Sequence, residues 1–354
     1  MKPKRVVILT DVPAHMMGLG SIARIRSLIE YVGSVAEAHG IIISHPPAED
    51  IAPIGSATLH FCAPAPDGQI DWGALRALVA SLKPDVGIIE YAHLGTARSV
   101  FPKGVPVVLD TLDLIYLRAE RFRAAGLQPV IEMTEDNEFS ILESFDRVLL
   151  ISKEEFDISV SRLGRKKCIF SPHVAPTDPV TPSSESIGGM LCSGATANQD
   201  ALDWLHNEVL TESETDAVPI RICGTISRLP DVEKRYPRFE ILPPVPLQTD
   251  FYSTVAFTMN PTRFGGGMKI KSVEAFGYGI PLVTTPEGID GCPSANYEFC
   301  RVAKTPEEFR DAVREVAASA EYRAHLREGA LRYAREHLST DAAFGALARF
   351  IQKS

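Results

Sequence analysis

The sequence predicts an α/β protein of two domains, each built around a parallel β-sheet. The chain has 354 residues, more than one hydrophobic core usually organises, and 45% of them are apolar, enough for two cores. Short apolar runs alternate with segments of helical periodicity along most of the chain, a pattern typical of parallel strands joined by helices. The stretch Ser171–Gly189 interrupts this pattern with four prolines and little apolar content, so it predicts a break between domains.

In the first half, apolar runs predict strands and longer periodic segments predict helices. We expect the strands at Arg5–Leu9, Ile41–Ser44, Val86–Glu90, Val107–Leu109 and Arg147–Ile151. We expect the helices at Ser21–Ala38, Trp72–Leu82, Thr134–Phe145 and Ser152–Leu163. Ser152 is followed three positions later by Glu155, the spacing of a capping box, which marks the start of the last of these helices.

The second half repeats the alternation after the proline-rich stretch. Its strands are expected at Met190–Ser193, Pro219–Cys223, Phe239–Leu242, Val255–Met259, Pro281–Thr285 and Phe299–Ala303. Its helices are expected at Asn198–Leu210, Met268–Phe276, Pro306–Ala318, Glu321–Glu336 and Thr340–Ile351. The predicted domains are therefore 1–172 and 190–337, joined by a hinge at 173–189.

Composition and charge argue against several classes of protein. A net charge of −9 does not suit a nucleic-acid-binding protein, which needs a basic face. The apolar run Val6–Leu9 is too short for a signal peptide, and no later run is long enough to cross a membrane. Six cysteines without metal-binding spacing suit reduced thiols. We therefore expect a cytoplasmic protein with no transmembrane segment, with a peripheral position at the inner membrane face left open.

One segment, Asn260–Thr285, carries most of the chemical information. It begins where an apolar strand ends, and Pro261 and the glycines Gly265–Gly267 then form a tight loop before a helix expected to start near Met268. Ligands of parallel α/β sheets bind outside the carboxyl ends of the strands, and a glycine loop before a helix exposes N–H groups that suit phosphate oxygens. The segment therefore predicts a phosphate-binding site.

Three charged side chains extend this site. Lys269 and Lys271 lie in the expected first turn of the helix, where a cation opposes the helix dipole unless an anion lies nearby. A diphosphate would remove that conflict. Glu274 follows on the same side of the helix, where its carboxylate could bind two sugar hydroxyls, as acidic residues do in nucleotide-binding folds. The alternative for Glu274 is an ordinary surface pair with Lys271.

A second glycine-containing loop, Pro286–Pro293, follows the next predicted strand and includes Gly288. Adjacent strands would bring both loops to one edge of the sheet, where they would enclose a pocket. The alternative is a plain turn.

The run GGGMKIKSVEAFGYGIPLVTT followed by EGIDG resembles the donor-site signature of a large family, the retaining glycosyltransferases with the GT-B fold (glycosyl transferases group 1). Weaker similarities lie at Gly18–Gly20, Asp110–Asp113 and Ser193–Leu205. The resemblance implies two facing Rossmann-like domains, of which the N-terminal one binds the acceptor and the C-terminal one binds the nucleotide sugar. It also implies that a closing helix in 338–354 crosses back to the N-terminal domain.

The resemblance further implies roles for single residues. Glu274 would hold the ribose hydroxyls of a nucleotide diphosphate sugar, and Lys269 or Lys271 would neutralise the leaving diphosphate in place of a metal ion. The sugar would be transferred with retention of the anomeric configuration, and the donor would be the substrate, with no cofactor. The donor-binding residues implied are Gly224, Gly265, Gly266, Gly267, Met268, Glu274 and Gly288.

Two positions depart from the family's pattern. Many members have two glutamates separated by seven residues, and Gly266 stands here at the earlier position. Many also have His-Asp where this chain has Leu112 and Asp113. One carboxylate contact to the donor sugar and one imidazole near it are therefore missing.

Several residues are candidates for the acceptor side. His15 and His93 follow predicted strands, so either could replace the missing imidazole, and we place His93 with Lys269 and Lys271 among the catalytic candidates. Arg118, together with Arg121, could bind an acidic acceptor or could form a solvated basic helix face. The full acceptor-side set is His15, Gly18, Gly20, Asp113 and Arg118. The acceptor is left open as a glycan, a lipid-linked compound or a small molecule.

The function predicted is glycosyl transfer. No cluster of histidine and cysteine has zinc spacing, so no metal site is predicted. Two alternatives stay open: a sugar-nucleotide epimerase or phosphorylase on the same fold, and a catalytically silent nucleotide-sugar-binding protein. The departures at Gly266 and Leu112 motivate the second of these alternatives.

Overall fold

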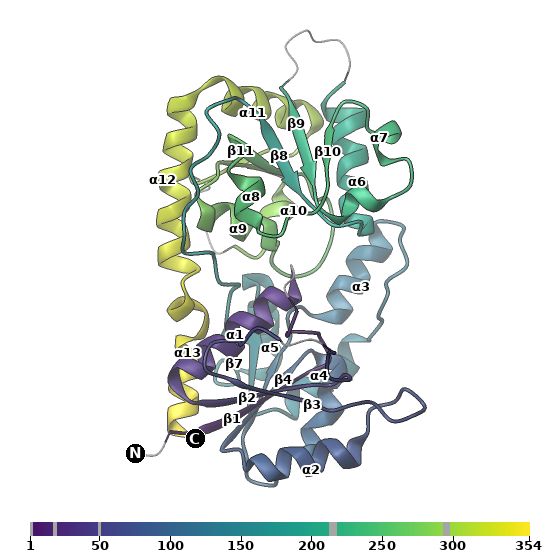
Figure 1. The fold of residues 1–354 in the computed structure, drawn as a ribbon, viewed down its shortest axis with the longest axis vertical. Coiled ribbons are helices and arrows are strands. Elements are labelled where there is room, and N and C mark those ends of the chain that lie inside the picture. The colour runs from purple at the N-terminus through teal and green to yellow at the C-terminus, as the bar shows by residue number, and fades with distance from the viewer. Residues whose placement is uncertain (1–2, 17–19, 49–50, 212–217, 293–297) are drawn as a thin grey trace. The chain divides into compact units, whose positions relative to one another are not determined.

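The computed structural model describes residues 3–16, 20–48, 51–211, 218–292 and 298–354, which form two compact units. Unit 1 contains Met1–Val174 and Thr340–Ser354, and unit 2 contains Ala175–Ser339. Each unit is an open parallel sheet with helices against it (Figure 1).

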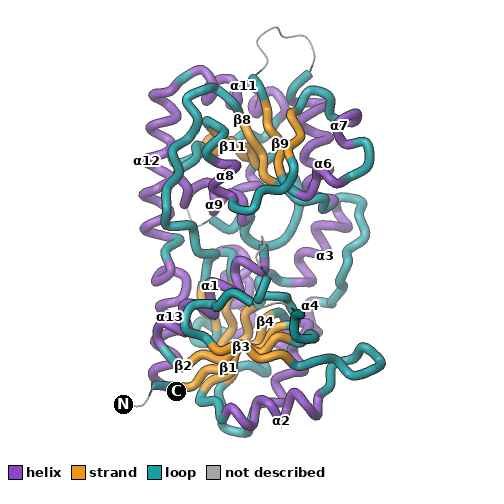
Figure 2. The backbone as a smooth tube through the Cα atoms, viewed as in Figure 1, coloured by secondary structure: helices purple, strands orange, loops and turns teal. Residues whose placement is uncertain are grey.

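Unit 1 is built on a parallel sheet (Figure 2). Among the described residues this sheet has seven strands, in the order β3-β2-β1-β4-β5-β6-β7. The strands are β1 (Arg5–Thr10), β2 (Glu37–Ile42), β3 (Thr58–Phe61), β4 (Val86–Glu90), β5 (Val107–Asp110), β6 (Arg147–Leu150) and β7 (Cys168–Phe170). Because the central strands are buried on both faces, they are nearly continuous apolar runs.

Helices cover both faces of this sheet. Val7 and Leu9 of β1 join the core filled by α2 and α4, whereas Val6 and Ile8 join the opposite core under α1 and α13. The C-terminal helix α13 lies beside α1, so the end of the chain returns to unit 1 (Figure 1). The helices are α1 (Ser21–Val35), α2 (Trp72–Leu82), the 3₁₀ helix η1 (Ala92–Val100), α3 (Ile115–Ala124), α4 (Glu135–Glu143), α5 (Lys153–Leu163) and α13 (Thr340–Lys353).

Unit 2 has a second parallel sheet in the order β10-β9-β8-β11-β12-β13. Its strands are β8 (Gly188–Leu191), β9 (Ile220–Cys223), β10 (Glu240–Leu242), β11 (Phe257–Asn260), β12 (Leu282–Thr284) and β13 (Arg301–Val302). Its helices are α6 (Thr196–Trp204), the π-helical turn η2 (Leu205–Val209), η3 (Thr225–Arg228), α7 (Val232–Arg235), α8 (Gln248–Tyr252), α9 (Ile270–Tyr278), α10 (Pro286–Ile289), α11 (Pro306–Ala318) and α12 (Ala320–His337).

The order of strands reverses once in each sheet. In unit 1 the chain moves outward from β1 through β2 to β3 and then continues on the other side of β1 with β4. In unit 2 the same reversal separates β8 from β11. Loops that leave two such strands diverge, and the crevice between them is where open α/β sheets bind ligands.

Several elements differ from those expected from the sequence. The first helix ends at Val35, because β2 already begins at Glu37, and α9 begins at Ile270 rather than at Met268. The loop expected at Pro286–Pro293 begins with the short helix α10. The strands β3 and β7 and the helix α8 were not expected, since each is five residues or shorter.

The proline-rich stretch leaves unit 1 after Val174 and then runs along unit 2. The Ala175 N–H donates to the Leu338 carbonyl at 2.9 Å, and those of Val180 and Ser183 donate to unit 2 carbonyls at 3.0 Å. All six cysteines are buried free thiols. No helix within the described ranges is long and apolar enough to span a membrane.

Candidate functional site

The glycine loop between β11 and α9 adopts a backbone that depends on glycine. Gly265 has φ 135° and Gly267 has φ 58°, values that residues with a Cβ rarely adopt. Gly266 lies between them and has no such positive φ. Met268 is buried, and Lys269 is the N-cap residue of α9, so the loop is anchored where the helix begins.

Asn260, the last residue of β11, ties this loop to the one after β12. Its side-chain amide donates to the Ser272 hydroxyl at 2.8 Å and to the Gly288 carbonyl at 2.9 Å, and the Thr262 hydroxyl donates to its Oδ1 at 2.6 Å. These groups are buried, so the network fixes the two loops against each other.

Gly288 lies within this hydrogen-bond network. A Cβ there would lie 2.2 Å from Thr284 Oγ1 and 2.4 Å from the Asn260 carbonyl oxygen. Its N–H donates to the Thr285 hydroxyl, the N-cap of α10, at 2.9 Å. The structure therefore gives Gly288 a packing role that joins the two loops, and its amide is already occupied.

Two lysines lie at the start of α9. Lys269 Nζ donates to the Gly267 carbonyl at 3.0 Å. Lys271 Nζ donates to Oδ1 of Asn198 at 2.5 Å, and burial lowers the pKa of Lys271. Asn198 belongs to α6, which follows β8, so this contact joins the two strands between which the strand order of unit 2 reverses.

Glu274 is a buried carboxylate on the same helix, with only 5% of its surface exposed. Gln248 Nε2 donates to its Oε1 at 3.2 Å, and the Tyr252 hydroxyl donates to its Oε2 at 3.4 Å. Burial raises the pKa of Glu274 to about 7, opposed by the Tyr252 hydrogen bond and by the charge of Lys271. The interpretation of Glu274 as half of a surface ion pair is therefore wrong.

Gly224 directly follows β9, beside the end of β8. Its φ is 122°, and a Cβ would lie 2.2 Å from the Cys192 carbonyl oxygen, so the close approach of two strands requires glycine here. Gly224 thus lies at the same carboxyl edge of the unit 2 sheet as the glycine loop.

The acceptor-side candidates lie at the carboxyl edge of the unit 1 sheet. A cavity of about 450 Å³ opens there, where Asp11 follows β1 and Tyr91 and His93 follow β4, the two strands at which the order reverses. His93 Nε2 lies 2.8 Å from Asp11 Oδ2. Arg118 of α3 also lines this cavity, and its guanidinium donates to Asp113 Oδ2 at 2.7 Å.

The structure brings His93 and Arg118 into one cavity, and Asp113 adjoins it through Arg118. His15 instead packs edge-on against Phe61 at 5.3 Å and does not line that cavity. Gly20 is the N-cap of α1 with φ 69°, which explains glycine at that position, and Gly18 lies outside the described residues.

The stretch Asp110–Asp113 divides into structural and cavity residues. Asp110 is fully buried and pairs with the equally buried Arg24, whose Nε donates to Oδ2 at 3.1 Å. Leu112 has φ 57° and directs its side chain into the apolar core. The family resemblance implies an imidazole at this position, where the structure has an apolar side chain packed in the core.

Two buried glutamates hold the start of α3. Glu138 accepts hydrogen bonds from the N–H groups of Ile115 and Tyr116 at 2.9 and 2.8 Å, and Glu155 accepts one from Leu114 at 3.0 Å. Burial raises the pKa of each glutamate to about 7. They satisfy N–H groups that a helix start leaves unpaired, and they thereby position the helix that carries Arg118.

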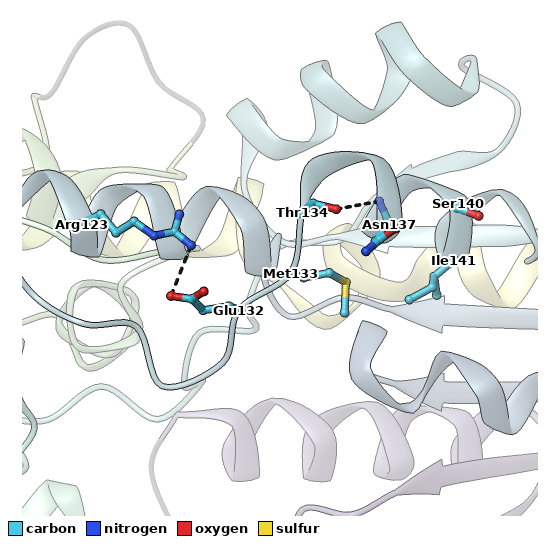
Figure 3. A pocket seen from close by; sticks show the side chains of 7 residues that line it. All are labelled: Arg123, Glu132, Met133, Thr134, Asn137, Ser140 and Ile141. Atoms are coloured by element: carbon cyan, nitrogen blue, oxygen red, sulfur yellow. Dashed lines mark hydrogen bonds and ion pairs between the residues drawn. The ribbon is translucent and has the colours of Figure 1, made fainter.

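A further cavity, of about 610 Å³, lies between the end of α3 and α4 (Figure 3). Its charged residues Arg123 and Glu132 pair with each other at 3.3 Å, and the Thr134 hydroxyl caps α4 by accepting from the Asn137 N–H. Its two charged side chains therefore pair with each other. Among the residues that the structure describes, no three His, Cys, Asp or Glu side chains gather as ligands for a metal ion.

Sequence reasoning missed Asp11, Asn198, Gln248 and Tyr252. Asp11 carries a signal, because it directly follows an apolar strand, and Asn198 lies in the stretch Ser193–Leu205 that has a weaker similarity to the family. Gln248 and Tyr252 carry none, since they lie on a helix of five residues and their contacts with α9 depend on how the two helices pack.

Part of the chain is similar to a known family, and its fold is similar to several solved structures. Residues 188–319 match the profile of the family described as Glycosyl transferases group 1. Among solved structures, the chain is similar to a sucrose-phosphate synthase from Thermosynechococcus elongatus (TM-score 0.76, 11% identity, 99% of this chain and 98% of that one). It is also similar to Anabaena HepE in complex with UDP and glucose (TM-score 0.71, 11% identity, 99% and 100% covered). Among curated proteins, none matches this chain in sequence.

Proposed function

We propose that this chain, which belongs to the glycosyl transferases group 1 family through residues 188–319 and has the GT-B fold, transfers a sugar from a nucleotide diphosphate sugar to an acceptor hydroxyl. Unit 2 binds the donor, and unit 1 binds the acceptor. The observation that carries the proposal is a buried carboxylate, Glu274, one turn beyond two lysines at a helix start where the strand order reverses.

The lysines support a diphosphate at the start of α9. Lys271 is held by Asn198 with a lowered pKa, and Lys269 turns back over the glycine loop. Both cations stand at the positive end of the helix dipole, which costs free energy unless an anion lies beside them. A diphosphate would accept hydrogen bonds from the lysines and from the N–H groups of the first turn.

Glu274 supports the ribose. Its carboxylate is desolvated and held by weak neutral donors at 3.2 and 3.4 Å, so it can exchange them for two hydroxyl groups. Acidic residues hold ribose hydroxyls in this manner in nucleotide-binding α/β folds. Since Anabaena HepE is described with UDP, we propose a uridine nucleotide first.

The proposed reaction breaks the bond between the anomeric carbon and the diphosphate oxygen and forms one between that carbon and the acceptor oxygen. The proton of the acceptor hydroxyl passes to an oxygen of the leaving diphosphate, and the anomeric configuration is retained. Lys269 and Lys271 neutralise the charge that develops on the diphosphate, a role that a metal ion would otherwise take. His93 and Arg118 lie on the acceptor side.

The test is a transfer assay on the full chain with UDP-, GDP-, ADP- and dTDP-sugars in excess EDTA, with sugar release followed by chromatography. We expect release from one donor, insensitive to the chelator, and its loss in the Lys269→Ala, Lys271→Ala double variant. The exposed Lys304→Ala is the matched control. Donor binding without release or transfer would favour the silent binding protein, and interconversion of two sugar nucleotides would favour the epimerase. Activity restored only by Mg²⁺ or Mn²⁺ would refute the metal-independent mechanism.

A further inference from the structure

Two cavities of unit 1 adjoin and differ in character. The cavity of about 450 Å³ at the ends of β1 and β4 shares Arg118 and Ile131 with a second one of about 280 Å³. The second is lined, apart from Arg118, by Phe122, Pro129, Val130 and Ile131. A polar region thus continues into an apolar one along α3 and the segment that follows it.

The polar region offers a hydrogen-bond acceptor on a carboxylate. Asp11 lines the cavity with 37% of its side chain exposed, and His93 Nε2 lies 2.8 Å from one of its oxygens. His93 Nδ1 is buried without a partner in the described part of the chain, so Nε2 is the ring nitrogen that bonds to the carboxylate. His93 therefore donates to Asp11 and positions it, and the carboxylate is the group available to a hydroxyl.

The charges of this region are paired. Arg118 donates to Asp113 at 2.7 Å, and the neighbouring Arg121 pairs with Glu154. Neither arginine calls for an anionic ligand, so the idea that they bind an acidic acceptor loses its support. An uncharged ligand with hydroxyl groups suits Asp11 better.

The apolar region is exposed to an unusual degree. Val130 is 96% exposed and Ile131 39% exposed, and both are among the few large hydrophobic side chains that the described surface presents. Adjacent exposed apolar residues beside a cavity are typical of a binding surface. Its continuity with the polar region means that one molecule can occupy both.

We propose that unit 1 binds an uncharged amphiphilic acceptor, whose hydroxyl group is held by Asp11 and whose alkyl or aryl group lies against Phe122, Val130 and Ile131. The inference rests on the proposed function, because it names the class of acceptor for that transfer. It also makes His93 a positioning residue that acts through Asp11.

Hexyl and methyl β-D-glucopyranoside are suitable probes, since they share their hydroxyls and differ in the apolar group. Binding to the full chain is measured by ligand-observed NMR. We expect the hexyl compound to bind at least about tenfold more tightly than the methyl compound. Val130→Ser should reduce this preference severalfold, whereas the control Val35→Ser, an equally conservative change at the far end of α1, should not. Asp11→Asn should weaken both compounds alike.

Equal binding of the two probes, no binding of the hexyl compound, or the same loss in Val35→Ser as in Val130→Ser would overturn the inference. Nucleotide-induced thermal stabilisation is recorded for every variant. This stabilisation tests the donor site in unit 2, whereas the glucosides test the acceptor site in unit 1. If nucleotide does not stabilise the wild type, the proposed donor site is wrong, and the binding of the two glucosides still decides the inference about unit 1.

Discussion

Replacement of Glu274 by Gln separates the ribose role from a purely structural one. The change keeps the shape of the side chain and removes its charge. In the free protein the carboxyl has a pKa of about 7, so at pH 8 it is mostly ionised. A charge-assisted hydrogen bond contributes roughly 1.5–3 kcal/mol, so the affinity for UDP should fall about ten- to hundredfold.

The same substitution should leave the stability of the free protein at pH 8 unchanged or raise it. Burial raises the pKa of Glu274 above its ordinary value of 4.5, so its contribution to stability is present at low pH and is lost as the pH rises through about 7. At pH 8 the variant no longer contains a buried charge, and its melting temperature should not decrease. Lower affinity together with unchanged or higher stability cannot result from misfolding.

The assay is calorimetry with UDP and with its 2′,3′-dideoxy analogue on both proteins at pH 8. Wild type should bind the analogue poorly, and the variant should treat both ligands almost alike. The four affinities close a double cycle, and its interaction term isolates the contact between Glu274 and the hydroxyls. The exposed Glu233→Gln in unit 2 is the control. An interaction term near zero would show that Glu274 does not touch the ribose.

Three further predictions concern the site and its supports. The Lys269→Ala, Lys271→Ala variant should lose affinity for UDP but bind uridine as before, and calorimetry showing equal losses would refute the diphosphate role. Burial raises the pKa of Glu138 from 4.5 to about 7, as it does for Glu155 and Glu274, so denaturant melts should show stability falling between pH 5 and 8, with up to about 3 kcal/mol of the loss from Glu138; Glu138→Gln should reduce that slope, and an unchanged slope would exclude Glu138 as one of its sources. Gly288→Ala should cost about 1–3 kcal/mol in thermal unfolding, because its Cβ would overlap Thr284 and Asn260, whereas an unaffected melting temperature would show that this hydrogen-bond network relaxes.

The buried elements of the fold could be predicted from the sequence, and the short ones could not. Strands β1, β4 and β6 are apolar runs bounded by polar residues, and α11 begins at a proline that follows a threonine cap, so each carries its own signal. The edge strand β3 has only four residues and a partly exposed face, which leaves little pattern to detect. Its place depends on pairing with β2, a contact that no local pattern encodes.

In the candidate site, too, some residues carry a local sequence signal, and others depend on contacts with distant parts of the chain. The glycine loop and Glu274 form one continuous motif, so local chemistry is enough to make them candidates. The hydrogen-bond partners of Glu274 come from α8, a helix of only five residues. Gln248 precedes Glu274 by 26 positions and Tyr252 precedes it by 22. Asp11 and His93 are separated by 82 positions and meet only because β1 and β4 are neighbours in the sheet.

The strand order also bears on the imidazole missing at Leu112. Strands β4 and β5 pair in register, with Glu90 opposite Asp110, so the residues after them emerge at one edge of the sheet. Leu112 follows β5 by two positions and turns into the core, while His93 follows β4 by three positions and lines the cavity. The chain therefore has an imidazole at this edge, one strand away from Leu112. Because that imidazole bonds to Asp11 through Nε2 and its Nδ1 is buried, its effect on an acceptor has to pass through the carboxylate. Its contribution should therefore be to acceptor binding rather than to contact with the donor sugar.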